Sequence, residues 1–359
     1  MILLFSQSAF ARLYFEDASM PELITSARAL AMGNAYASKV DDSWAAFYNP
    51  AGLGTVRKLQ VHLTNIHLET NNGFLDVTGG SGNFLKSVSN YSDAFKASGI
   101  RSLLADSPGR MSHARLNFFP NITFRGITLG YMYSQQQRAR LESASSDFEI
   151  AERVDSGPVL SLSLSLWGGI VKFGATAVVL TRKEMWKDIA STAPTVIDKN
   201  VDYKKGTMTH MVASTRVTLP VFLLPTFSLV VRNSSMGDWY NTDLGGAPEA
   251  IPQTVDGSFS LTPFTSRTGR LHFEIGVRDI GDRYTDVPSS RKIQGGFELG
   301  FMRSMFVRAG YGDGWGSGGI GVRNEKFIFD LTTYAVEASQ DGYRKEEDRR
   351  YALNMAFGF

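Results

Sequence analysis

The chain has 359 residues, of which 43% are hydrophobic and 20% charged, and 37 Lys and Arg against 35 Asp and Glu give a net charge of +2. The longest uncharged apolar runs are shorter than the roughly 20 residues of a membrane-spanning helix, which excludes a helical membrane protein with many spans. The balanced charge argues against nucleic-acid binding, and the absence of Cys excludes disulfides, thiolate metal sites and cysteine nucleophiles.

The first residues differ from the rest of the chain. Residues 1–11 are mostly apolar and end in Ala9-Phe10-Ala11, the small-x-small pattern that signal peptidase accepts, although a basic region before the apolar core is missing. Two interpretations stay open, the remnant of an export signal or a buried N-terminal strand. Residues 12–56 contain Ala-rich, helix-compatible stretches cut by turn residues. We expect them to form a compact segment that precedes the main fold, residues 57–359.

From about residue 58 onward, the dominant hydrophobic period is two. In Leu160–Leu166 every even position is Leu and every odd position is Ser, which predicts a strand with one apolar face. Similar alternation follows in Leu271–Val277. The pattern predicts about 14 strands, near residues 58–69, 111–124, 126–142, 147–166, 169–187, 204–219, 226–237, 252–264, 269–281, 291–302, 304–312, 317–324, 326–338 and 350–359.

Alternation alone also fits a soluble β-sandwich. Two features favour a membrane barrel. Several strands exceed the 5–6 residues usual in soluble sheets, and short links alternate with long polar ones, as in outer-membrane barrels. We therefore predict an all-β fold, a transmembrane antiparallel β-barrel whose even strand number closes the sheet.

The first outer loop, residues 70–110, contains amphipathic stretches within Phe84–Leu104 that predict short helices. They suit a ligand-entry site, a dock for a protein partner, or a loop that only caps the barrel.

The last strand has large apolar residues at every second position and is expected to end in an aromatic residue. This arrangement resembles the C-terminal strand that the outer-membrane assembly machinery recognises, which makes that machinery an expected partner. The residues concerned are Tyr351, Leu353, Met355, Phe357 and Phe359.

Residues 26–54 carry a local motif: Ala27-Arg-Ala-x-x-Met-Gly-x-Ala35, an Asp-Asp pair, and Tyr48-Asn-Pro-Ala-Gly-Leu53. This motif resembles the N-terminal segment of the long-chain fatty-acid transporter (FadL) superfamily, most closely its PorV/PorQ-type branch. The residues that carry the resemblance in the predicted plug are Arg28, Gly33, Asp41, Asp42, Asn49, Pro50, Ala51 and Gly52, together with Met32 and Ala35.

The resemblance implies a 14-stranded barrel in the bacterial outer membrane whose lumen holds residues 12–56 as a hatch, or plug. It implies two alternative functions. One is passive transport or binding of hydrophobic small molecules such as long-chain fatty acids, with membrane lipid around the barrel. The other is a PorV-like accessory module that docks a secreted or surface protein through its outer loops.

Candidate chemistry is sparse. No nucleophile motif occurs and the five His show no metal-ligand spacing, so we expect no enzyme, no cofactor and no metal. Gly310–Gly319 is interpreted as a hairpin, because a phosphate loop needs a following helix. Charged residues that face the predicted lumen are expected mainly to pair with each other. Among them, Arg278 and Arg308 are candidates for steering the carboxylate of an amphiphile.

Overall fold

The computed structural model describes residues 13, 22–79, 90, 93–143, 145–234, 237–263, 269–302, 304–324, 326–339 and 342–358. The leader-like residues 1–11 and the terminal Phe359 lie outside this part of the chain. None of the helices in the described residues has the length and apolar character needed to cross a bilayer as a helix.

In the described residues, fifteen strands form one antiparallel sheet that closes on itself, because β15 pairs with β1. Apart from β2 and β3, each strand pairs with its neighbours in chain order. The strands are β1 (Gln60–Asn71), β2 (Arg110–Phe118), β3 (Asn121–Phe124), β4 (Ile127–Leu141), β5 (Phe148–Leu166), β6 (Val171–Ile189), β7 (Lys204–Thr218), β8 (Thr226–Arg232), β9 (Thr254–Leu261), β10 (Arg270–Val277), β11 (Ile293–Phe301), β12 (Met305–Gly312), β13 (Trp315–Arg323), β14 (Phe327–Glu337) and β15 (Glu347–Gly358).

The strands β2 and β3 are two parts of one barrel position, because both pair with β1 and with β4. Phe119 and Pro120 separate them, and Pro lacks the N–H that a ladder needs. Near this break, the pairing of β1 with β15 shifts register between His62 and Thr64. The barrel therefore has 14 strand positions, which confirms the predicted fold class.

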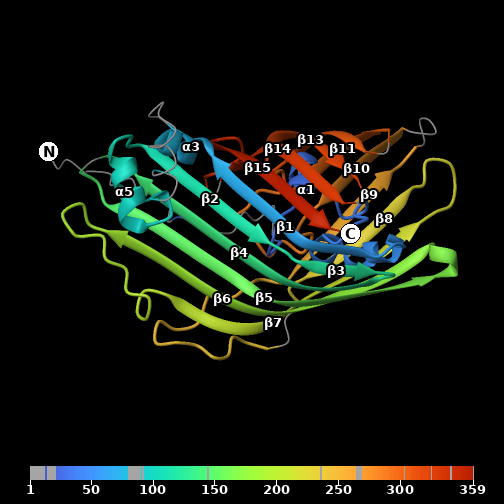
Figure 1. Cartoon of the computed structure of the whole chain (residues 1–359), viewed down its shortest axis with the longest axis horizontal. Helices are drawn as coiled ribbons and strands as arrows, with labels where there is room; N and C mark the ends of the chain where they lie inside the picture. Colours follow the sequence, from blue (N-terminus) through green and yellow to red (C-terminus); the bar gives the residue numbers. More distant parts are fainter. Residues whose placement is uncertain are drawn as a thin grey trace.

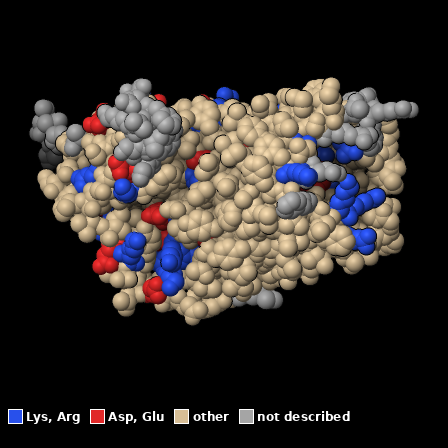
Figure 2. Space-filling view, viewed as in Figure 1, with Lys and Arg blue, Asp and Glu red and all other residues tan. Residues whose placement is uncertain are grey.

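The alternation sets which side chains face outward. In β5, Leu160, Leu162 and Leu164 are 43%, 49% and 59% exposed, whereas Ser161 between them is fully buried. Figure 2 shows the result on one face, a broad area without charged side chains between charged groups at either end. An apolar belt around a barrel with polar contents is what a bilayer-spanning sheet requires.

The two ends of the barrel differ. At one end, which we call the tight-turn end, hairpins close through short connections such as the 3₁₀ turn η2 (Trp167–Gly169). At the other, the loop end, lie α3 (Asn72–Gly79) and α5 (Ala97–Ala105), both within the first long loop (Figure 1). The helix α5 overlaps the end of the predicted stretch 84–104 and runs one residue beyond it, whereas α3 precedes the stretch and most of 80–92 lies outside the described residues.

Both helices pack on the barrel through one apolar cluster. Their buried side chains include Phe74, Val77, Ile100 and Leu104, which join residues of β2, β4, β5 and β6 such as Phe148. Arg101 of α5 also reaches the loop between β6 and β7 and donates hydrogen bonds to three of its carbonyls and to a threonine hydroxyl, at 2.7 to 3.0 Å. The first long loop is thus tied to its neighbour.

Candidate functional site

Residues 22–56 lie inside the barrel. They contain α1 (Ala27–Ala31), α2 (Ala45–Tyr48) and the 3₁₀ helix η1 (Pro50–Thr55). The helix α1 lies against β12 to β15, whereas η1 lies against β5, β6 and β7 on the opposite wall of the barrel. In Figure 1 this blue segment runs behind the front strands. Nearly all of its side chains are buried, so the segment occupies the lumen between the two sides.

The local motif fixes the shape of this segment. The Asn49 side chain accepts a hydrogen bond from the Ala51 amide (3.1 Å) and donates one to the Ala37 carbonyl (2.7 Å). Pro50 opens η1, where its fixed φ is suitable and its missing N–H costs nothing. Gly52 leaves room for Val40, whose carbonyl oxygen would be 2.6 Å from an added Cβ. The motif therefore builds a rigid turn that holds residues 37–53 together.

Gly33 brings α1 against the barrel. Its φ of +63° suits glycine, and it lies directly against the backbone of Tyr311. On the barrel side, a Cβ on Gly310 or Gly312 would overlap with the Gly33 backbone. The hairpin prediction for Gly310–Gly319 is confirmed by the pairing of β12 with β13. The reason for its glycines, the close approach of α1, has no signal in the sequence.

Arg28 is the centre of the first ion-pair group. Its guanidinium binds Glu298 of β11 through two hydrogen bonds (2.7 and 2.8 Å), Asp41 at 2.7 Å and Asp42 at 3.2 Å. Glu298 also accepts a hydrogen bond from Arg308 of β12 (2.8 Å). The Arg28 and Glu298 side chains are 3% and 4% exposed. Motif residues of the segment are thus joined to the barrel by buried charge pairs.

The group extends in both directions around the sheet. Arg308 also pairs with Asp330 of β14 at 2.6 Å, and Arg323 of β13 pairs with Asp42 at 3.0 Å. Lys39 lies 3.5 Å from Asp41. Burial raises the pKa of the Asp41 carboxyl, but Arg28 first, then Lys39 and Arg323, outweigh it and hold that pKa well below its usual value.

A second ion-pair group binds the start of the segment. Glu22 lies 3.1 Å from Arg232 of β8 and 2.8 Å from Arg278, the residue after β10, and both arginines contact Asp256 of β9 at 2.6 Å. Arg278 also donates to the Asn34 carbonyl at 3.0 Å. Sequence reasoning missed Glu22, Arg232 and Asp256, since alternation gives a side chain its face but not its partner.

The structure therefore places both candidate arginines, Arg278 and Arg308, in buried pairs with carboxylates of the chain. Their guanidinium groups are engaged with Asp256 and Glu22, and with Glu298 and Asp330 respectively. A role in steering a ligand stays a prediction, and it requires that a ligand carboxylate displaces one of these partners.

The side of the lumen formed by β4 to β7 is different in kind. There the segment packs through apolar side chains, among them Trp44, Phe47 and Leu53. The barrel contributes buried apolar residues: Met132, Val159, Val178, Leu180 and Met208. Phe119, at the break between β2 and β3, inserts its ring between the two aromatics, with centroids 5.0 Å from Phe47 and 6.0 Å from Trp44.

In the part of the chain that is described, no group of three or more His, Asp or Glu residues has the geometry to hold a metal ion. The strand β15 alternates as predicted and pairs with β14 and β1, so it closes the barrel. Recognition of its residues by an assembly machinery stays a prediction.

Comparisons with known proteins agree with this architecture. No family model and no curated protein matches the chain. Among solved structures, a TodX ΔS2S3 mutant, described as a monoaromatic hydrocarbon channel, shares 9% identity over 93% of this chain and 98% of its own, with a TM-score of 0.53. A FadL homologue of Pseudomonas aeruginosa shares 10% identity over 93% and 97%, with a TM-score of 0.44.

CdiB from Acinetobacter baumannii is also similar, with 10% identity, 85% of this chain covered and a TM-score of 0.38; the chain spans 60% of the length of CdiB. At these identities the comparisons speak for the fold only, and the TodX match carries that argument. The predicted resemblance to the PorV/PorQ-type branch stays a prediction.

Proposed function

We propose that this chain is a bacterial outer-membrane channel that passes hydrophobic small molecules, such as long-chain fatty acids, and that residues 22–56 are its plug. One observation carries the proposal: the plug meets the two sides of the lumen differently. Its contacts with β4 to β7 are apolar with a few hydrogen bonds, such as that from Arg216 to the Val40 carbonyl, whereas its buried ion pairs with the barrel in the described residues all lie on the side of β8 to β14. A shift of the plug away from the apolar side breaks no ion pair. A hydrophobic molecule should therefore pass the plug on that side at a lower cost in free energy.

The surroundings of the barrel support the same proposal. Its exterior presents apolar side chains to lipid, and short turns at one end with longer loops at the other match an orientation with the tight-turn end in the periplasm. The TodX structure is a hydrocarbon channel by its description, and its likeness in fold is compatible with transport here.

The absence of Cys allows a direct test with an engineered disulfide. Ser38 of the plug and Ser228 of β8 have their Oγ atoms 3.1 Å apart. The double variant S38C/S228C should form a disulfide that tethers the plug, because sulfurs in place of these oxygens need only a small rotation to reach the S–S bond length of about 2.05 Å. The single variant S228C is the matched control.

The assay is uptake of labelled oleate by Gram-negative cells that lack their own fatty-acid channel. We expect uptake with the wild type and with S228C. We expect at least a tenfold loss with oxidised S38C/S228C, and recovery after reduction. No uptake with correctly assembled wild type would reject transport, and unchanged uptake with the tethered plug would reject the moving plug.

A second candidate function, docking of a protein at the outer loops, is favoured by apolar side chains that these loops expose. Val196 and Val201 between β6 and β7 are 63% and 64% exposed, and Leu244 between β8 and β9 is 94% exposed. Cross-linking in intact cells, followed by purification, separates the two functions. A stoichiometric protein partner supports docking, whereas co-purified lipid without a protein supports transport.

A further inference from the structure

Two cations face each other inside the barrel at its tight-turn end. Lys172 of β6 and Arg216 of β7 are directly paired across the two strands, and both point into the lumen beside η1. The neighbouring positions on either side are Ser165 of β5 and Ser228 of β8. Like charges directly opposite each other on one face of a sheet destabilise it. The arrangement therefore calls for a compensating group.

The chain itself does not supply that group within its described residues. Lys172 is only 6% exposed, makes no ion pair there, and donates to the Gly169 carbonyl. Arg216 donates from Nη1 to the Val40 carbonyl (3.0 Å), and its buried Nε has no hydrogen-bond partner. By contrast, Arg28, Arg232, Arg278 and Arg308 in the same lumen each pair with a carboxylate.

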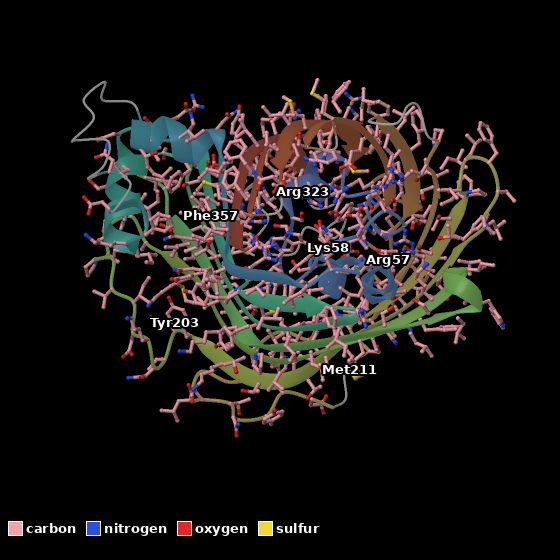
Figure 3. The ribbon with its side chains drawn as sticks, turned by 45° about the vertical axis from the view of Figure 1, so that its right-hand side comes forward. Arg57, Lys58, Tyr203, Met211, Arg323 and Phe357 are labelled. Carbon is pink, nitrogen blue, oxygen red and sulfur yellow. The ribbon has the colours of Figure 1, made fainter. Side chains whose placement is uncertain are left out.

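The two carboxylates that interact electrostatically with Arg216, Asp41 and Glu274, are already bound to other groups. Asp41 pairs with Arg28 at 2.7 Å, and Glu274 accepts a hydrogen bond from the Ser38 amide at 2.7 Å. A third cation, the exposed Arg57, follows η1 and adds positive charge near Lys172. Figure 3, with the tight-turn end turned forward, shows Arg57 within the outline of the barrel.

We propose that Lys172 and Arg216, with Arg57 at the rim, form a binding site for an oxyanion, the carboxylate or phosphate of an amphiphile, at the tight-turn end of the lumen. Lys172 precedes Val178 of the apolar side by six positions on the same strand, a separation of about 20 Å. An amphiphile can then keep its tail on the apolar side while its anionic group reaches this site. The identity of the ligand rests on the transport function proposed above.

The test compares two probes with the same twelve-carbon chain, laurate with an anionic headgroup and dodecanol with a neutral one, and it measures their binding to the full chain in a non-ionic detergent. Wild type should bind laurate at least tenfold more tightly than dodecanol. The variant K172M/R216M removes both charges and keeps apolar bulk. We expect it to lose this preference while dodecanol binding stays unchanged. The exposed cation Lys326 at the same end provides the control variant K326M, which should behave as wild type.

Stability gives an independent readout. If Lys172 and Arg216 only stabilised the fold, K172M/R216M would unfold at a lower urea concentration than wild type. If they form an unoccupied anion site, K172M/R216M should unfold at the same or a higher urea concentration than wild type, because the repulsion between the two cations is relieved. Equal binding of laurate and dodecanol by wild type, or unchanged laurate preference in K172M/R216M, would overturn the site.

Competition with inorganic phosphate distinguishes the two ligand sources. Displacement of laurate by phosphate from wild type supports a general oxyanion site that also accepts lipid headgroups, whereas no displacement supports a carboxylate site. The experiments can reject the anion site and the proposed transport independently of each other. Equal binding of laurate and dodecanol by wild type, with oleate uptake intact, rejects the site alone, and a clear charge preference of wild type without any uptake by cells rejects transport alone.

Discussion

Arg28 of α1 and Glu298 of β11, 270 residues apart in the chain, form a two-hydrogen-bond ion pair inside the barrel, with distances of 2.7 and 2.8 Å. The pair joins the plug to the side of the lumen opposite the apolar contacts. Because both groups are buried, each is costly without the other. The pair therefore attaches α1 to the barrel.

Removing the Arg28 charge should loosen this attachment. In R28M, Glu298 keeps Arg308 and Asp42 keeps Arg323, so we expect a loss of about 3 kcal/mol in the free energy of unfolding, at the low end for a broken buried pair. Urea unfolding followed by tryptophan fluorescence measures it. The double variant R28M/E298Q should be less destabilised than the sum of its single variants, and strict additivity would contradict a direct pairing.

Acid should weaken the same attachment through Asp41. Its pKa is lower in the folded chain than in the unfolded chain, so ionised Asp41 stabilises the fold above its unfolded pKa of about 3.9. This contribution is lost as the pH falls below that value toward the folded pKa. The urea midpoint of wild type should therefore drop between about pH 5 and pH 2 more steeply than that of D41N. Parallel curves would show that Asp41 contributes nothing to the acid dependence.

The contact between Gly310 and Gly33 sets how closely the plug approaches the barrel. In G310A the new Cβ would overlap with the backbone of Met32 and Gly33, so the plug must shift, at a cost of about 1–3 kcal/mol. We expect higher ion conductance in planar bilayers and a lower urea midpoint. Gly316 in the same hairpin is the control, because no heavy atom lies within 4 Å of a Cβ added there. Equal conductance of G310A and G316A would contradict this role.

The sequence allowed the barrel to be predicted almost strand by strand, because each strand has one face toward lipid and the other toward a polar interior. Apolar and polar residues therefore alternate along it. Leu160 and Ser161 show why: one faces outward and the other is buried, as the pattern indicates. Strand ends are less exact. The strands β8 and β10 end at Arg232 and Val277, several residues before the predicted ends at 237 and 281, because polar loop residues can continue an alternating pattern without a partner strand.

The interior was less predictable, because its contacts join distant residues. The motif marked Arg28, Asp41 and Asp42 as important, but nothing local indicates that Glu298 and Arg323 are their partners. Arg278 and Arg308 were singled out for a ligand, and the structure pairs both with carboxylates. Lys172 and Arg216 belong to the lumen-facing charged residues for which the sequence predicts mainly pairing with other charges. Their lack of a counter-charge became visible once the register of β6 and β7 was known.

Arg101 should control the exposure of the loop between β6 and β7, residues 190–203. Its hydrogen bonds to that loop are charge-assisted, and such bonds contribute about 1.5–3 kcal/mol each when buried and less at this partly exposed site. In R101M we expect trypsin to cleave after Lys199 at least about tenfold faster, because local opening of the loop becomes easier. The control is K96M, which removes an exposed cation of the same long loop that pairs only with nearby Asp93 in the described residues. Equal cleavage rates in R101M and K96M would show that the loop is held by its apolar contacts with α5 instead.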